Sequence, residues 1–297
     1  LKTTDKKSVC SFCSVGCNLN LKVDGELLVK SVPDKESKVD NGLLCVKGRF
    51  GADIAQKEQR ILSPLVRKNG ELVEVDWNEA LLTVAKGTQS IISGYGSDSV
   101  ALSISDRYTN EEIFAAIKLG RDVLGTENIF SFNGFGGGIR DVLGYDASTN
   151  SFDELLSTEV IVVVGSDLMK NHPIVGLKVK KATENGAKLI VINPFASQID
   201  EWAYKKVCPE NNTIFIKGII KALIDNGAVA SDLNTVGFAE LKESLSEITT
   251  DADAIEIANL YGKAKKAMIV FDQSNITVAG AHLLADMAVI SGHIGKP

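Results

Sequence analysis

Continuous apolar runs, rich in β-branched residues and separated by longer stretches with helical spacing, dominate the chain from about residue 99 onward. The runs predict strands at Ser99–Ile104, Asn128–Phe132, Glu159–Val164, Lys188–Ile192 and Ala267–Phe271. Strands that are buried on both faces read as uninterrupted apolar runs, and parallel strands need long crossover connections. The pattern therefore predicts an α/β fold in which helices cover both faces of a parallel sheet.

The stretches between these strands place apolar residues at the spacing of an amphipathic helix. The predicted helices run from Asn110 to Leu124, through Lys181, around Ile219, Leu241 and Ile257, and from Ala279 to about Ser291. They occupy the places of the crossover connections that a parallel sheet requires.

The first 75 residues alternate between apolar and polar positions, which is typical of antiparallel strands. Leu19–Val23 and Glu26–Lys30 flank an Asp-Gly pair and predict a β-hairpin. A short helix is expected between Arg49 and Gln59. A second strand–turn–strand is predicted from Leu62 to Val75, followed by a helix from Trp77 to about Gly94. A small antiparallel β unit thus precedes the α/β part.

Four of the five cysteines follow the pattern C-x2-C-x3-C-x27-C, formed by Cys10, Cys13, Cys17 and Cys45. A cubane iron–sulfur cluster needs four thiolates at its corners, and one tight loop plus a distant fourth cysteine can supply them. Structural zinc also takes four thiolates, usually from two Cys-x2-Cys knuckles, and disulfides are a further alternative. The spacing favours a [4Fe-4S] cluster, which would stabilise this small unit and be covered by the hairpin.

The fifth cysteine, Cys208, has no cysteine near it in the sequence, and we expect it to be a buried, small apolar residue.

Composition and charge limit the classes of function. The 297 residues are 44% hydrophobic and 24% charged with a net charge of −6, enough for two or three ordinary domains. The negative charge and the lack of a basic patch argue against binding to nucleic acid or to an anionic membrane. No apolar run reaches the roughly 18 residues of a membrane span, and no signal segment precedes the cysteines. We expect a soluble cytoplasmic protein that reaches the cytoplasmic face of a membrane only through partner subunits.

Two predicted strand ends carry residues suited to a nucleotide-type ligand. Ligands of open parallel sheets bind beyond the carboxyl ends of the strands, where small and polar residues allow close approach to a diphosphate or ribose. A helix that begins with proline would present free N–H groups to phosphate. The candidates are Gly165, Ser166, Asp167, His172, Pro173 and Asn193. The same residue types are common in any strand-to-helix turn, so a purely structural role is the alternative.

The sequence shows no Ser-His-Asp, Cys-His or paired-carboxylate spacing, and we predict no catalytic residue in this segment.

Several motifs together resemble those of the molybdopterin oxidoreductase family. This family contains formate dehydrogenases, periplasmic nitrate reductases and the large cluster-bearing subunit of bacterial respiratory NADH dehydrogenase. The similar segments are the four-cysteine pattern, Leu44–Phe50, Arg60–Arg67, Val75–Leu81, Asn171–Val175, Asn185–Lys188, Ile192–Pro194 and Ser291–Pro297.

The resemblance implies roles for the candidate residues. Cys10, Cys13, Cys17 and Cys45 resemble the ligands of the family's [4Fe-4S] cluster, and Lys47 resembles the lysine that relays electrons between cluster and pterin. The six strand-end residues match segments that line the guanine-dinucleotide cofactor in catalytic members. We expect three parts: a cluster domain at 1–60, a partial α/β domain at 61–131 and a Rossmann-like, pterin-cofactor-type domain at 132–297.

Two departures from the family pattern decide between its members. Where catalytic relatives place a cysteine or selenocysteine on molybdenum, this chain has Ser131-Phe132-Asn133-Gly134, and the family's Asp-Pro-Arg is Asn193-Pro194-Phe195. The loss of a soft ligand and of a charged pair favours an electron-transfer domain without molybdenum chemistry, in an NADH dehydrogenase-like or formate dehydrogenase-linked complex. We expect no stoichiometric molybdopterin guanine dinucleotide.

The implied partners are other subunits or domains of such a complex, including ferredoxin-like iron–sulfur domains. The alternatives are a catalytic formate dehydrogenase-type enzyme with molybdenum or tungsten on a bis-guanine-dinucleotide pterin, and a zinc-stabilised scaffold.

Overall fold

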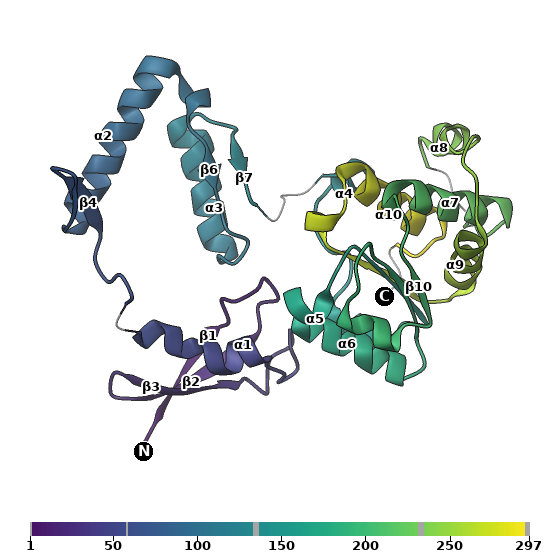
Figure 1. The fold of residues 1–297 in the computed structure, drawn as a ribbon, viewed down its shortest axis with the longest axis horizontal. Helices are drawn as coiled ribbons and strands as arrows, with labels where there is room; N and C mark the ends of the chain where they lie inside the picture. The colour runs from purple at the N-terminus through teal and green to yellow at the C-terminus, as the bar shows by residue number, and fades with distance from the viewer. Residues whose placement is uncertain (1, 58, 133–136, 231–234, 295–297) are drawn as a thin grey trace. The chain divides into compact units, whose positions relative to one another are not determined.

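The computed structural model describes residues 2–57, 59–132, 137–230 and 235–294. The chain divides into two compact units, Leu1–Asn133 and Gly134–Pro297 (Figure 1). The finer division of the first unit near residue 60 stays a prediction.

The first unit begins with a three-stranded antiparallel sheet. Strands β1 (Thr4–Val9), β2 (Asn18–Asp24) and β3 (Leu27–Pro33) lie in the order β1-β2-β3. The predicted hairpin is confirmed as β2–β3, and Gly25 in its turn has a φ of 61°, which glycine adopts without strain. The hydrophobic pattern missed β1 because all six of its residues are exposed and three of them are charged.

Two short helices follow this sheet. Helix α1 (Val46–Phe50) and the 3-10 helix η1 (Gly51–Gln56) confirm the predicted helical segment. The Gln56 side chain accepts from the backbone N of Leu28 at 2.8 Å and donates to its carbonyl at 2.9 Å. These two bonds tie the end of η1 to strand β3.

The rest of the first unit alternates short strands with helices. The elements are β4 (Leu65–Lys68), β5 (Glu71–Glu74), α2 (Trp77–Tyr95), η2 (Ser97–Ser99), β6 (Leu102–Ser103), α3 (Asn110–Lys118), the π-helical η3 (Leu119–Leu124) and β7 (Ile129–Phe130). Asp76 caps α2 by accepting from the backbone N of Glu79 at 2.8 Å. The helix α2 buries none of its residues, and β6 pairs with β7 over two residues only.

The second unit contains the predicted parallel sheet. Strands β8 (Val160–Val164), β9 (Lys188–Ile192), β10 (Lys205–Val207) and β11 (Ala267–Phe271) lie in the order β10-β9-β8-β11 and are all parallel. Its helices are α4 (Ile139–Leu143), η4 (Phe152–Ser157), α5 (Leu168–Asn171), α6 (Pro173–Glu184), η5 (Gln198–Trp202), α7 (Asn212–Asp225), α8 (Phe238–Ser244), α9 (Ala252–Lys263), η6 (Gln273–Asn275) and α10 (Val278–Ile290).

Helices cover both faces of this sheet (Figure 1). Alternate residues of β8 and β9 join α7, α9 and α10 in one apolar cluster, while α5 and α6 lie on the other side. Every residue of β8 is buried, and burying a valine or isoleucine contributes about 1.5–3 kcal/mol. The structure is therefore a mixed α/β fold with a small antiparallel sheet at its start, as predicted.

The expectation that Cys208 is buried is wrong. Cys208 follows β10, a three-residue strand at the sheet's edge that the sequence pattern did not predict, and its side chain is exposed. An edge strand has a partner on one side only, so the residue after it has little to pack against.

Among the described residues, no helix combines the length and the apolar character that crossing a bilayer requires.

Candidate functional site

Three of the four patterned cysteines lie on one loop between β1 and β2. The antiparallel pairing of these strands brings Val9 opposite Asn18, so the two ends of the loop lie side by side. The backbone N of Cys10 donates to the carbonyl of Cys17 at 2.9 Å and closes the loop. Gly16, with a φ of 77°, makes the turn that returns the chain to Cys17.

The fourth cysteine lies at the start of helix α1, which packs closely against this loop. Cys45 is the N-cap residue of α1, and Gly48 lies one turn further along. A Cβ atom at Gly48 would lie 3.2 Å from the Sγ of Cys10, and one at Gly51 would lie 2.4 Å from the ring of Phe12. The two glycines therefore allow the helix to approach the cysteine loop closely, a role that the sequence analysis missed.

The four thiols influence one another electrostatically. Burial, followed by the charges of Asp40 and the other three cysteines, raises the pKa of the Cys17 thiol to about 12. Burial is also the main cause of the raised pKa of Cys10, to which Cys13 and Cys45 contribute. Thiolates crowded in this way need a positive metal centre to balance their charge, so the donor set fits an iron–sulfur cluster.

Within the described ranges, no three His, Cys, Asp or Glu side chains, the four patterned cysteines included, are arranged to hold a single metal ion. Lys47 lies on α1 two residues after Cys45 and its side chain is exposed, and its relay role stays a prediction.

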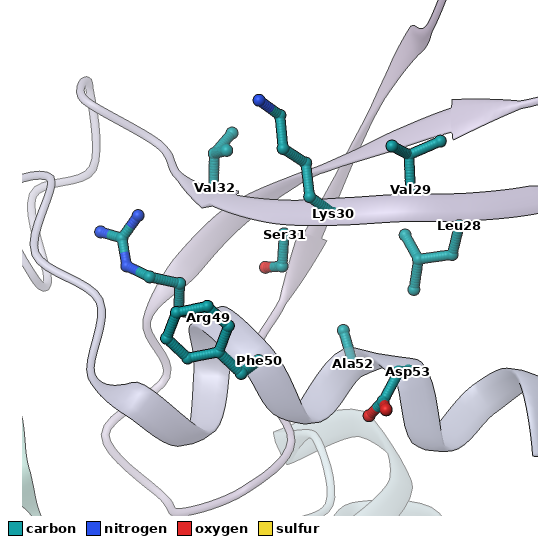
Figure 2. A pocket seen from close by; sticks show the side chains of 9 residues that line it. All are labelled: Leu28, Val29, Lys30, Ser31, Val32, Arg49, Phe50, Ala52 and Asp53. Atoms are coloured by element: carbon teal, nitrogen blue, oxygen red, sulfur yellow. The ribbon is translucent and has the colours of Figure 1, made fainter. Parts of the chain in front are cut away.

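A surface pocket of about 470 Å³ lies between β3 and the helices α1 and η1 (Figure 2). Its walls are Leu28–Val32 and four residues of the helices, including Arg49 and Asp53. No cysteine lines it, so it is separate from the candidate cluster site.

In the second unit, the structure brings the two predicted strand ends together. Asn193 is fully buried after β9, and its Oδ1 accepts from the backbone N of Ser166 at 3.0 Å. Its Nδ2 donates to the Ser166 carbonyl, also at 3.0 Å. The Asn193 amide therefore joins the ends of β8 and β9 and is already occupied by these bonds.

The remaining strand-end candidates also have internal roles. The backbone N of Gly165 donates to the carbonyl of Ile192 at 3.0 Å, and a Cβ at Gly165 would lie 3.1 Å from the carbonyl oxygen of Asn275. Asp167 caps α5 by accepting from the backbone N of Lys170 at 3.4 Å. His172 and Pro173 form the junction between α5 and α6.

These contacts do not fit direct binding of a nucleotide phosphate by this turn. The backbone N–H groups of Gly165 and Ser166 and the amide of Asn193 already have partners inside the protein. The Ser166 hydroxyl is buried with no hydrogen-bond partner among the residues described. The six residues keep their cofactor-binding role only as a prediction.

A further strand end, which was not predicted from the sequence, lies at the same carboxyl edge of the sheet. Because the strand order is β10-β9-β8-β11, the direction of winding reverses between β8 and β11, where ligands of such sheets bind. Asp272 follows β11, and its Oδ2 accepts from the Nδ2 of Asn171 at 3.1 Å. The run Asp272–Asn275 has the same polar character as the other strand ends, and this signal could have identified it.

Two protein-family models match this chain. The model of the "Molybdopterin oxidoreductase Fe4S4 domain" matches residues 3–57, and that of "Molybdopterin oxidoreductase" matches residues 60–288. The chain belongs to the molybdopterin oxidoreductase family. All four patterned cysteines and Lys47 lie within the Fe4S4 match, which supports a [4Fe-4S] cluster, and the six strand-end residues lie within the larger match.

Relatives in the molybdopterin oxidoreductase family include formate dehydrogenases. The chain is 30% identical to the F420-dependent formate dehydrogenase 2 subunit alpha of Methanococcus maripaludis, covering 98% of this chain and 46% of the relative. It is also 30% identical to formate dehydrogenase H of Escherichia coli, covering 98% and 45%. The chain thus spans about half the length of these relatives.

A solved structure with the same fold is acetylene hydratase from Pelobacter acetylenicus, with a TM-score of 0.81. The match covers 98% of this chain and 44% of the hydratase, and at 22% identity it shows the fold alone.

Proposed function

We propose that this chain holds one [4Fe-4S] cluster on Cys10, Cys13, Cys17 and Cys45 and transfers electrons within a larger redox complex, without molybdenum chemistry of its own. The observation that carries this proposal is the gathering of the four thiols by one closed loop and the start of α1. The complex is of the NADH dehydrogenase-like or formate dehydrogenase-linked type.

The residues around the thiols have definite tasks in this proposal. A bound cluster supplies a one-electron redox couple. The chain fixes the four thiolates, and the ring of Phe12 packs against Gly51 beside them. The cation of Lys47 stabilises added negative charge on its way between the cluster and the next centre. The partners we propose are subunits with ferredoxin-like iron–sulfur domains, since similar proteins are named as alpha subunits.

Two features argue against molybdenum chemistry in this chain. Four of its five cysteines are assigned to the cluster and the fifth follows β10, so no thiol falls at the Ser131-Phe132 segment. Residues 133–136 of that loop lie outside the described residues. At the carboxyl ends of the strands, Phe195 takes the place of the family's arginine, whose cation would suit a phosphate. The backbone N–H groups of Gly165 and Ser166 nearby already have partners inside the protein.

The second candidate is a catalytic formate dehydrogenase-type enzyme with molybdenum or tungsten on a bis-guanine-dinucleotide pterin. The formate dehydrogenase names of its relatives favour it. In that case, residues outside this chain would supply the contacts that the sheet edge lacks.

Formate-dependent dye reduction and pterin analysis separate the two candidates. The complete polypeptide is expressed with the cofactor-assembly machinery and purified without oxygen. Our proposal predicts no dye reduction by formate and no stoichiometric pterin. Pterin guanine dinucleotide at about one or two per chain, together with activity, would favour the catalytic candidate, whereas zinc in place of iron would favour a scaffold.

A further inference from the structure

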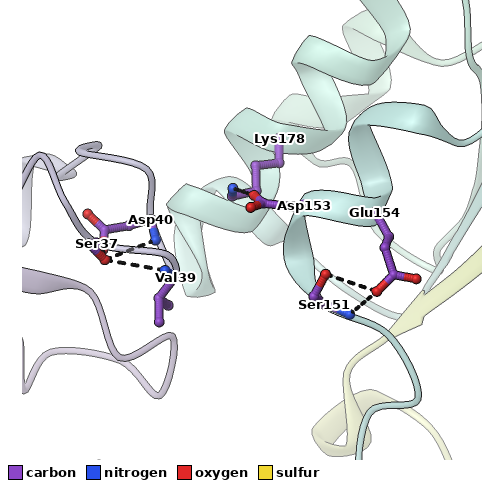
Figure 3. Close-up of polar contacts among 7 residues, drawn as sticks. All are labelled: Ser37, Val39, Asp40, Ser151, Asp153, Glu154 and Lys178. Carbon is purple, nitrogen blue, oxygen red and sulfur yellow. Dashed lines mark hydrogen bonds and ion pairs between the residues drawn. The ribbon is translucent and has the colours of Figure 1, made fainter. Parts of the chain in front are cut away.

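A buried carboxylate lies beside the proposed cluster ligands. Asp40 is 0% exposed and sits in the turn between β3 and Cys45. Its Oδ1 accepts from the backbone N of Asn18 at 3.1 Å and also from the hydroxyl of Ser37, in the turn shown in Figure 3. Fully buried carboxylates are rare because an ionised group loses its hydration, so this one calls for an explanation.

The bonds of Asp40 connect the two segments that carry the cysteines. Asn18 follows Cys17 directly, and the carbonyl of Asp40 accepts from the backbone N of Leu43, two residues before Cys45. The second carboxylate oxygen, Oδ2, is buried and has no hydrogen-bond partner in the described part of the chain. No lysine, arginine or histidine there forms an ion pair with Asp40, so its negative charge is offset only by neutral donors.

We propose that Asp40, besides positioning the cysteine segments, lowers the reduction potential of the cluster through its buried negative charge. Reduction adds an electron to a centre that four thiolates already make electron-rich. A negative charge fixed nearby in a medium of low dielectric constant disfavours that step. This inference rests on the proposed cluster at Cys10, Cys13, Cys17 and Cys45.

Position and chemistry both support an electrostatic role. The Asp40 carboxylate accepts from the backbone N of Asn18, the residue that follows Cys17, so its charge lies close to that proposed ligand. An asparagine would offer Asn18 the same oxygen acceptor without a charge, so hydrogen bonding alone does not require an acid at this position.

The test is an EPR-monitored redox titration of Asp40→Asn in the complete polypeptide, purified without oxygen. This change keeps an acceptor for Asn18 and removes the charge. We expect unchanged iron and sulfide per chain and a roughly tenfold larger equilibrium constant for one-electron reduction, which equals a rise of about 59 mV. Glu36→Gln is the matched control: it removes a charge from the same turn, but the Glu36 side chain is 88% exposed, and solvent screens it. The control should leave the potential unchanged.

Ser37→Ala supplies a test of opposite sign. It keeps the Asp40 charge but removes a hydroxyl that offsets it, so the potential should fall. If Asp40→Asn does not fold, the Ser37→Ala result decides alone: a lower potential supports the proposal and an unchanged one overturns it. General loosening of the turn would shift both variants in the same direction and would also overturn it.

The two proposals fail in different ways. A wild-type protein without iron and sulfide would overturn the proposed function, and this inference with it. A wild-type cluster whose potential is the same in Asp40→Asn would overturn this inference alone.

Discussion

Replacing Gly51 with alanine tests whether helix α1 must approach the cysteine loop as closely as the structure shows. The added Cβ would lie 2.4 Å from the Cζ of Phe12 and 2.8 Å from its Cε2, while an ordinary contact begins at 3.4 Å. The ring must therefore move by about 1 Å, and Phe12 lies on the loop next to Cys13. Gly51 has a φ of −80°, so alanine adds no backbone strain and the effect is purely steric.

Overpacking of this kind costs about 1–3 kcal/mol. If iron leaves only from molecules whose cysteine loop has opened, destabilising the closed loop by that amount increases the fraction of open molecules by roughly 5- to 150-fold. The assay is the rate at which a chelator removes iron from the anaerobic protein, followed by the loss of visible absorbance. Gly51→Ala should accelerate it by that factor.

The matched control is Gly87→Ala in helix α2, where no atom beyond the neighbouring residues and the helix's own backbone lies within 4 Å of the added Cβ. Alanine is favoured over glycine in a helix by about 1 kcal/mol, so this variant should be at least as stable as the wild type and should lose iron at the wild-type rate. A Gly51→Ala protein that also loses iron at the wild-type rate would refute the close approach of α1 to the loop.

Three further predictions concern single side chains. Cys13→Ala should abolish the iron–sulfur absorbance and loosen residues 1–60 while circular dichroism shows the second unit still folded; unchanged iron content would contradict the ligand assignment. Lys47→Ala should keep its iron but show a lower reduction potential in a redox titration, because a cation that offsets the added electron is gone; an unaltered potential would remove Lys47 from the relay. Asn193→Ala should destabilise the second unit by about 1–3 kcal/mol for each Ser166 group left unsatisfied, measured by urea unfolding, and Asn193→Asp should lose at least as much, because a buried carboxylate oxygen would face the Ser166 carbonyl.

The sheet of the second unit could be predicted because its main strands are continuous runs of apolar, largely β-branched residues. β8 reads Val-Ile-Val-Val-Val and is buried along its whole length. β1 and β10 were not predicted because they lack such apolar runs. β1 is polar and exposed, and β10 has only three residues and lies at the edge of the sheet. The error over Cys208 follows from the missed β10, because a cysteine beyond an unrecognised edge strand cannot be placed by its residue type.

The cluster site could likewise be predicted only in part. The spacing of the cysteines predicts that they gather, because three lie on one loop and the polar segment after the hairpin can carry the chain back to the fourth. The spacing does not show that Gly48 and Gly51 let that helix approach Cys10 and Phe12, because the approach depends on tertiary packing. The burial of Asp40 was equally hidden, since a carboxylate in a polar turn is normally exposed.

The most direct test of the central claim is the iron, sulfide, zinc and molybdenum content of the complete polypeptide, purified without oxygen, together with the EPR spectrum of the reduced protein. The account predicts about four iron and four sulfide per chain, the signal of one reduced [4Fe-4S] cluster, and no stoichiometric molybdenum or tungsten. Zinc without iron would contradict the cluster, and molybdenum or tungsten bound in proportion to the chain would contradict a role limited to electron transfer.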